Sequence, residues 1–285
     1  MTDRLFQGYS TFSNHGTSQG IIPRFYLQMV DMAQFAFDKE GVSERLQQFL
    51  DNNISDFTEF YDVYTELRET YIDYKEGLTN GKYYSVDEKG AFRHDRSKEL
   101  ILKKKTKDFF IQGRLVVYNF GKSGVIDDKQ FTLNNFLIVS DKNFEKNKLN
   151  CLDSSVGKKY EILLQIIEKA RKDFLTSFNQ IRADFEHQNL QIDDFKVQIN
   201  NNQVEIIEPS FGHSNLLTEI EICYKRLLEL IEILMAFFYG LQAYEKTNGF
   251  MTLFKRDEYD YSNLLYKYVI MPNMYETGLT KLIGP

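Results

Sequence analysis

The chain has 285 residues, of which 42% are hydrophobic and 15% aromatic, and this content excludes a wholly disordered protein. Its net charge of −6 also excludes a protein that coats nucleic acid through bulk positive charge, because such binding needs many lysines and arginines against the phosphates. Any contact with nucleic acid must therefore be local.

The cysteines and the N-terminal sequence indicate a compartment. The two cysteines, Cys151 and Cys223, lie far apart in the sequence and cannot form a disulfide framework. The N-terminus is polar and lacks the apolar segment of a signal peptide. These features favour a reducing environment, so we expect a cytoplasmic protein.

The first third of the chain is predicted to be helical, after an N-terminal segment without periodicity. Pro23 fits the first turn of a helix that ends at Gly41, and a short helix is expected over residues 43–51. Ser55 is a suitable N-cap for a longer helix that ends near Gly77. Because the whole chain has four prolines, long uninterrupted helices are favoured.

A hairpin, a helix and a polar segment follow. Residues 82–94 come after an Asn-Gly turn and predict a short hairpin. Residues 97–120 carry apolar side chains at helical spacing and predict a third long helix. Residues 124–150 are polar apart from one apolar run at residues 136–139, so we expect an irregular segment with at most one strand.

The clearest helix is predicted over residues 158–188. Its apolar residues are spaced by three and four positions, which is the pattern of one buried stripe on a helix. They are Leu163, Ile167, Ala170, Phe174, Phe178, Ile181 and Phe185. This segment is therefore expected to be a core helix of the fold.

The last third combines a hairpin with two helices. Residues 195–206 alternate between apolar and polar residues on either side of an Asn-rich turn, which predicts a hairpin. A long helix is expected from Ser214 or Asn215 to the Asn-Gly pair at residues 248–249, and a terminal helix over residues 261–270. The long helix contains Glu229 and Glu232, and carboxylates in lipid are costly, so we expect no membrane segment.

These elements predict a mainly α protein, an antiparallel helical bundle with small β-hairpin insertions. The predicted division is an N-terminal helical region of unassigned role over residues 1–95 and a bundle over residues 96–285. Because no linker is obvious, one continuous domain over residues 21–285 is the alternative.

Two stretches are rich in basic residues. They comprise Arg96, Lys98, Lys103, Lys104, Lys105 and Lys107 in one stretch, and Lys158, Lys159, Lys169, Arg171 and Lys172 in the other. Charges at such spacing are typical of solvated helix faces, which is the favoured interpretation, and local nucleic-acid contacts are the alternative.

The candidate catalytic residues lie at the end of the central helix. Arg182 and His187 are separated by four residues, among them Asp184 and Glu186. RNA can be cleaved without a metal if its 2′-hydroxyl attacks the adjacent phosphorus. Histidine can move the protons near neutral pH, while arginine can offset charge on the phosphoryl oxygens. No spacing of histidine, cysteine and carboxylate residues suggests a metal site.

An arginine and a histidine separated in this way at the end of a bundle helix resemble the HEPN superfamily of helical, metal-independent ribonucleases. The resemblance covers residues 158–245, and the helix predicted over residues 97–120 is a further candidate for it. It implies an endoribonuclease with Arg182 and His187 catalytic and Asp184 or Glu186 assisting, without a cofactor. It also implies an RNA substrate, a homodimer that pairs two motifs in one cleft, and a role as a toxin or an effector of defence against phage. Such a protein would have an antitoxin or another regulatory partner.

The sequence departs from the family pattern at two positions. Ala183 stands where the family has a polar residue directly after the arginine. Asn189 stands where one subclass has a tyrosine that a partner nucleotidyltransferase modifies, so that kind of toxin–antitoxin pairing is not expected.

A structural interpretation of the same residues remains open. Arg182 and Glu186 are four positions apart and can form an ordinary ion pair on the helix, while His187 can stabilise the last turn. The protein would then be a non-catalytic helical module for protein interactions.

Overall fold

The structure is a computed structural model of the chain. It describes residues 21–38, 53–86, 92–122, 131–187, 192–200, 203–211, 214–255 and 267–272, together with the single residues 44 and 88. The short helix predicted over residues 43–51 lies outside the described residues, apart from Glu44.

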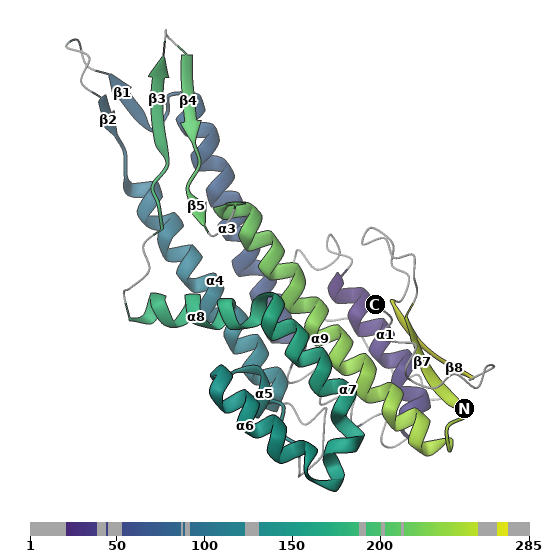
Figure 1. Cartoon of the computed structure of the whole chain (residues 1–285). Helices are drawn as coiled ribbons and strands as arrows, with labels where there is room; N and C mark the ends of the chain where they lie inside the picture. The colour runs from purple at the N-terminus through teal and green to yellow at the C-terminus, as the bar shows by residue number, and fades with distance from the viewer. Residues whose placement is uncertain are drawn as a thin grey trace, which may run out of the picture. The chain divides into compact units, whose positions relative to one another are not determined.

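The described chain is mainly helical, and its strands form small antiparallel pairs, so the predicted fold class is confirmed (Figure 1). The helices are α1 (Ile21–Ala36), α3 (Ser55–Thr79), α4 (Ser97–Lys122), α5 (Asn134–Leu137), α6 (Asp141–Leu152), α7 (Ser155–Ala170), α8 (Thr176–Glu186) and α9 (Leu216–Lys246), with a π-helical turn η2 (Arg171–Leu175) between α7 and α8. The strand pairs are β1 (Tyr84–Val86) with β2 (Phe92–His94), β3 (Lys196–Asn200) with β4 (Gln203–Ile207), β5 (Ser210–Phe211) with β6 (Ser214–Asn215), and β7 (Met251–Lys255) with β8 (Tyr268–Pro272).

The chain divides into two compact units. The first unit comprises Met1–Thr58, Lys122–Asp128 and Glu232–Pro285, and the second comprises Glu59–Gly121 and Lys129–Ile231. All four candidate catalytic residues belong to the second unit.

Aromatic rings hold the helices of the second unit together. Phe60 of α3 stacks on Phe109 of α4 with ring centroids 5.0 Å apart. Tyr64 of α3 stacks on Tyr224 of α9 with centroids 4.3 Å apart and the planes within 7°. Figure 1 shows α3, α4 and the beginning of α9 side by side. Ring stacking between large buried side chains therefore fixes the frame on which α8 rests.

Helix α8 packs across α4 around one phenylalanine and one glycine. The ring of Phe110 lies 5.1 Å from that of Phe178 and 5.7 Å from that of Phe185, centroid to centroid. A Cβ atom at Gly113 would lie 2.6 Å from the ring of Phe178 and 3.0 Å from that of Phe60. The position of the Phe178 ring against the α4 backbone thus requires a residue without a Cβ atom at position 113.

The single helix predicted over residues 158–188 is wrong, because the π-helical turn η2 separates α7 from α8. The extra residue of a π turn moves the buried face by one position. Leu163, Ile167, Phe178 and Phe185 are buried as predicted, but within η2 the buried residues are Arg171 and Leu175, whereas Phe174 is partly exposed.

The partners of Arg171 explain why this charged residue is buried in η2. Its guanidinium donates to the carbonyl oxygens of Phe136 at 3.1 Å and Val139 at 2.9 Å, and pairs with the Asp141 carboxylate at 2.5 Å. It also lies 4.8 Å from the centre of the Phe144 ring. One side chain therefore stabilises the end of α5 and the beginning of α6.

The prediction of an irregular segment over residues 124–150 is also wrong for the residues that the structure describes. Residues 136 and 137 belong to α5 and not to a strand, and residues 141–150 belong to α6. Ser140 caps α6 by accepting from the Asn143 amide at 3.4 Å. Within α6 only Phe144 is buried, so the helix has no apolar stripe that a periodicity argument could detect.

Both hairpins predicted in the second unit are confirmed. β1 pairs with β2 from Tyr84 opposite His94 to Val86 opposite Phe92. β3 pairs with β4 from Lys196 opposite Ile207 to Asn200 opposite Gln203. Antiparallel pairing therefore accounts for the alternating sequence of residues 195–206.

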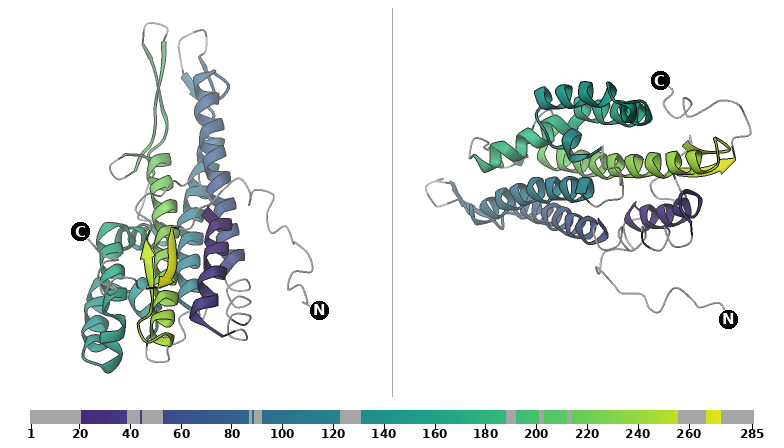
Figure 2. Two further views of the ribbon diagram at one scale, coloured as in Figure 1. Left: turned by 90° about the vertical axis from the view of Figure 1, so that its right-hand side faces the viewer. Right: turned by 90° about the horizontal axis from the view of Figure 1, so that it is seen from below.

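The first unit is built from α1, the end of α9 and the β7–β8 hairpin, which lies near both helices in Figure 2. Gln28 of α1 donates to the buried Glu232 carboxylate at 3.1 Å and accepts from the Tyr268 amide at 2.8 Å. The helix predicted over residues 261–270 is therefore wrong at residues 268–270. These residues form part of β8, because β7 and the Gln28 side chain supply partners for their backbone.

Helix α9 confirms the predicted long helix. Asn215 caps it by accepting from the Thr218 amide at 2.9 Å. Within the described residues it is the one helix long and apolar enough to cross a membrane, but 78% of its most apolar window is buried inside the structure. Burial of this extent fits the core helix of a soluble protein.

Replacement of Arg171 tests its structural role. Arg171→Ala should lower the free energy of unfolding by about 2–4 kcal/mol, because it leaves two carbonyl groups without their donor and removes the ion pair with Asp141. The neighbouring Lys172 is exposed and pairs with Glu168, so Lys172→Ala should leave the free energy of unfolding close to that of the wild type. Urea unfolding followed by circular dichroism measures both, and equal costs would contradict this role.

Candidate functional site

The four candidate residues lie at the C-terminal end of α8. Arg182, Asp184 and Glu186 belong to its last turns, and His187 is the C-cap, with φ −87° and ψ 6°. The His187 amide donates to the Ala183 carbonyl oxygen at 3.0 Å. The helix therefore ends where the sequence predicts, and the motif lies at a helix terminus.

Arg182 is bound to its own helix. Its guanidinium forms an ion pair with the Glu186 carboxylate one turn later, and 26% of the side chain is exposed. Its Nε atom is buried and has no hydrogen-bond partner among the described residues. A guanidinium has five N–H donors, so one carboxylate leaves Arg182 with hydrogen-bonding capacity to spare.

The two candidate assisting carboxylates are both engaged within α8. The Asp184 carboxylate accepts from the Gln180 side chain at 2.8 Å, and that of Glu186 accepts from Arg182. Neither carboxylate forms a hydrogen bond with the His187 side chain in the described part of the chain. Any assistance from them therefore requires a rearrangement of these pairs.

The His187 side chain is exposed to solvent. With the described residues it forms no hydrogen bond or ion pair, so the structure does not join it to Arg182. Residues five apart on an ideal helix differ in direction by about 140°, which accounts for the separation. An exposed imidazole next to a helix terminus is accessible to a substrate or to a second subunit.

Arg114 of α4 is a residue near this site that the sequence did not single out. Its Nη1 atom donates to the Asn179 side-chain oxygen of α8 at 3.1 Å. Burial lowers the pKa of Arg114, the positive charge of Arg182 lowers it further, and the Glu186 carboxylate opposes this effect. Two guanidinium groups from different helices therefore lie close enough to repel each other.

Most of the first basic stretch is neutralised by carboxylates. Lys98 pairs with Asp73 at 3.2 Å, and Lys105 pairs with Glu66 at 2.5 Å. Each of these pairs joins α4 to α3. The interpretation as a helix face with ordinary ion pairs is favoured over a nucleic-acid contact at these positions.

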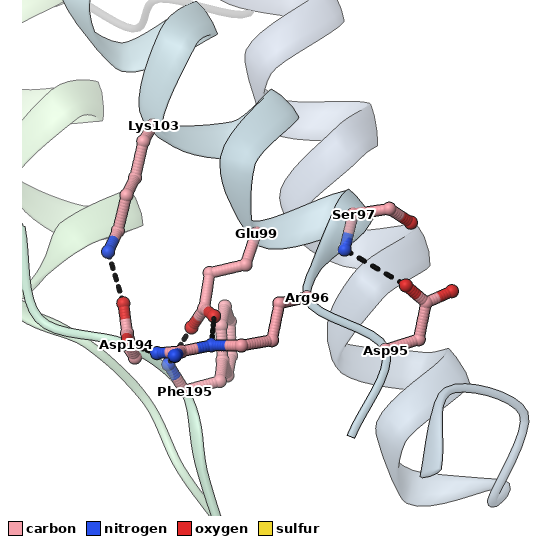
Figure 3. A network of polar contacts seen from close by, with 7 residues as sticks. All are labelled: Asp95, Arg96, Ser97, Glu99, Lys103, Asp194 and Phe195. Atoms are coloured by element: carbon pink, nitrogen blue, oxygen red, sulfur yellow. Dashed lines mark hydrogen bonds and ion pairs between the residues drawn. The ribbon is translucent and has the colours of Figure 1, made fainter. Parts of the chain in front are cut away.

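Arg96 and Lys103 of the same stretch anchor the β3–β4 hairpin, as Figure 3 shows. Both bind the carboxylate of Asp194, which precedes β3. The buried Glu99 carboxylate accepts from Arg96 at 3.2 Å and from the Phe195 amide at 3.1 Å. These charges hold the hairpin to the beginning of α4 and are not available to a ligand.

A groove of about 470 Å³ lies between the end of α3 and the beginning of α9. Within it, the Glu208 carboxylate accepts from the Tyr71 hydroxyl at 2.5 Å and from Lys75 at 2.7 Å. Burial would raise the pKa of Glu208, but these two donors bring it below its ordinary value. Glu76 and Glu221 also line the groove, so its charge disfavours phosphate, and none of the four candidate residues lines it.

Other catalytic groups find little support within the described residues. Burial raises the pKa of the Cys223 thiol to about 12, so this cysteine is protonated and a poor nucleophile at neutral pH. The described residues contain no group of three or more histidine, cysteine and carboxylate side chains placed to hold a metal ion.

No protein-family model matches the sequence, and neither a curated protein nor a solved structure is detectably similar to it. The resemblance to the HEPN superfamily therefore rests on the residues and elements described above.

The pairing of Asp194 with Arg96 and Lys103, which anchors the β3–β4 hairpin, can be tested through its pH dependence. Burial would raise its pKa, but Lys103 and Arg96 bring it below the ordinary value of about 3.9. The ionised carboxylate therefore stabilises the fold above about pH 4, and this contribution is lost as the pH falls through the lowered folded-state pKa.

Asp194→Asn should lower the free energy of unfolding at pH 7 by an amount on the order of 1 kcal/mol, and the difference from the wild type should shrink toward pH 2. Urea unfolding at several pH values measures this. Asp31→Asn changes an exposed carboxylate on α1 and serves as the matched control. A variant as stable as the wild type at pH 7 would show that the anchor contributes nothing.

Proposed function

We propose that this protein is a metal-independent endoribonuclease of the HEPN type, in which Arg182 binds the scissile phosphate and His187 transfers protons. The observation that carries the proposal is the exposed imidazole of His187 at the end of α8, in the same motif as an arginine that lies near a second guanidinium. An accessible proton carrier and a local excess of positive charge are what this reaction requires.

The proposed reaction is an internal transfer at phosphorus. The 2′-hydroxyl oxygen of one nucleotide bonds to the adjacent phosphorus, and the bond from phosphorus to the 5′-oxygen breaks. One imidazole accepts the 2′-hydroxyl proton, and another donates a proton to the leaving 5′-oxygen. The products are a 2′,3′-cyclic phosphate and a 5′-hydroxyl end, and the arginine offsets charge on the phosphoryl oxygens.

The proposed reaction uses two imidazoles, and each chain carries one His187. The proposal therefore favours a symmetric homodimer. The exposure of His187 and its separation from Arg182 on α8 support an arrangement in which the ends of two α8 helices share one substrate. In this proposal the biological role is that of a toxin or a phage-defence effector, and an antitoxin or another regulatory partner holds the cleavage of cellular RNA in check.

A second candidate is favoured by the Arg182–Glu186 ion pair. A pair four residues apart stabilises a helix without any catalytic purpose, and His187 at the C-cap fits the same interpretation. The protein would then be a non-catalytic helical module that binds other proteins.

Cleavage of RNA in the presence of EDTA discriminates the two candidates. The wild type should cleave single-stranded RNA and leave 2′,3′-cyclic phosphate ends, and His187→Ala should lower the rate about 100-fold or more, because proton transfer typically contributes that much. His94→Ala removes an imidazole outside the motif and should leave the rate unchanged. Equal background cleavage by the wild type and His187→Ala would favour the interaction module.

A further inference from the structure

Arg114 of α4 is hydrogen-bonded to the side of α8 that carries Arg182. Gly113 lets the ring of Phe178 approach the α4 backbone, so the next residue, Arg114, reaches Asn179 on the following position of α8. Asn179 and Arg182 are three residues apart and therefore lie on the same side of α8. The hydrogen bond to Asn179 therefore places Arg114 on the side of α8 that carries Arg182.

The charge at this crossing is not balanced by the described residues. Arg114 and Arg182 carry two positive charges, and one carboxylate, Glu186, faces them. Arg114 forms no ion pair within 4 Å among the described residues, since its bond to Asn179 is to a neutral amide. The Nε atom of Arg182 is buried without a partner in the same part of the structure. Two partly satisfied guanidinium groups of like charge are stabilised by an anion that bridges them.

We infer that Arg114 is a second phosphate-binding residue of the site that contains Arg182, and that the two guanidinium groups hold one phosphate of a single-stranded RNA between them. This inference rests on the proposed function and deepens it by adding a residue from outside the motif. Arginine suits this task because its planar donors match two phosphate oxygens at once. In this arrangement the phosphate replaces Glu186 as the anionic partner of Arg182. It also gives Arg114 an anionic partner.

Asn179 acts as a positioning residue in this arrangement. Its side-chain oxygen accepts from Arg114, and its side-chain nitrogen donates to the Leu137 carbonyl oxygen at 3.2 Å. Both ends of the amide are therefore held, which fixes the direction of the Arg114 side chain. Asn179→Ala should weaken RNA binding without removing a charge.

Binding of a short, fluorescein-labelled 2′-O-methyl RNA tests the inference, because this RNA has no free 2′-hydroxyl and cannot be cleaved. Arg114→Gln should weaken binding about tenfold, and the slope of log Kd against log salt should fall by about 0.7, the value for one phosphate contact on a single strand. Arg114→Lys keeps the charge and should lose less affinity. Fluorescence anisotropy measures each variant at several salt concentrations.

Lys104→Gln is the matched control, because it removes one charge from an exposed position on the same helix. It should leave both the affinity and the salt slope close to those of the wild type. Thermal unfolding of every variant shows whether the fold is intact. If Arg114→Gln does not fold, Arg114→Lys and Asn179→Ala carry the test, and both should bind more weakly than Lys104→Gln.

The outcomes separate this inference from the proposed function. If the wild type binds the RNA and Arg182→Gln weakens binding while the Arg114 and Asn179 variants do not, the inference is wrong and the proposed function stands. If Arg114→Gln and Lys104→Gln lose the same affinity, the contribution of Arg114 is general charge, and the inference is again wrong. If the wild type does not bind RNA, both the inference and the proposed function fail.

Discussion

The contact of α8 with α4 around Gly113 is the constraint on which the site depends. The rings of Phe110, Phe178 and Phe185 fill this contact, and the glycine leaves room for the Phe178 ring against α4. At the same contact Arg114 is hydrogen-bonded to Asn179 of α8. Arg182 lies one turn later on the same side of α8. Apolar packing thus determines which charged groups become neighbours, and the electrostatic properties of the site are a consequence of that packing.

Charge in this acidic chain is mostly used for structure. Arg171 stabilises helix ends, and Arg96 and Lys103 anchor a hairpin through Asp194. These groups have carboxylate or carbonyl partners at short range, so they offer little to a phosphate. Arg114 differs because its described partner is a neutral amide. The location of incompletely paired guanidinium groups, and not the density of basic residues along the sequence, is therefore the better guide to a phosphate site.

The sequence predicted much of the fold, because long helices and hairpins have local signals. The cap residue Asn215 and the asparagine-rich sequence between β3 and β4 are examples. The π-helical turn at Arg171 was missed, since a one-residue shift leaves the periodicity on either side intact. Helix α6 was missed because it buries Phe144 alone. The ion pair of Arg182 with Glu186 follows from their spacing, whereas Arg114 is 68 positions from Arg182 in the sequence, and nothing local connects them. Contacts of this kind are decided by tertiary packing.

The most direct test of the account is whether His187 and Arg182 act on the same phosphate. Proton–carbon NMR of the histidine rings during titration with 2′-O-methyl RNA measures this, with His15, His94 and His213 as internal references. The account predicts that the His187 ring signals shift as the RNA binds and that Arg182→Gln abolishes the shift. RNA binding that leaves the His187 signals unmoved would contradict it.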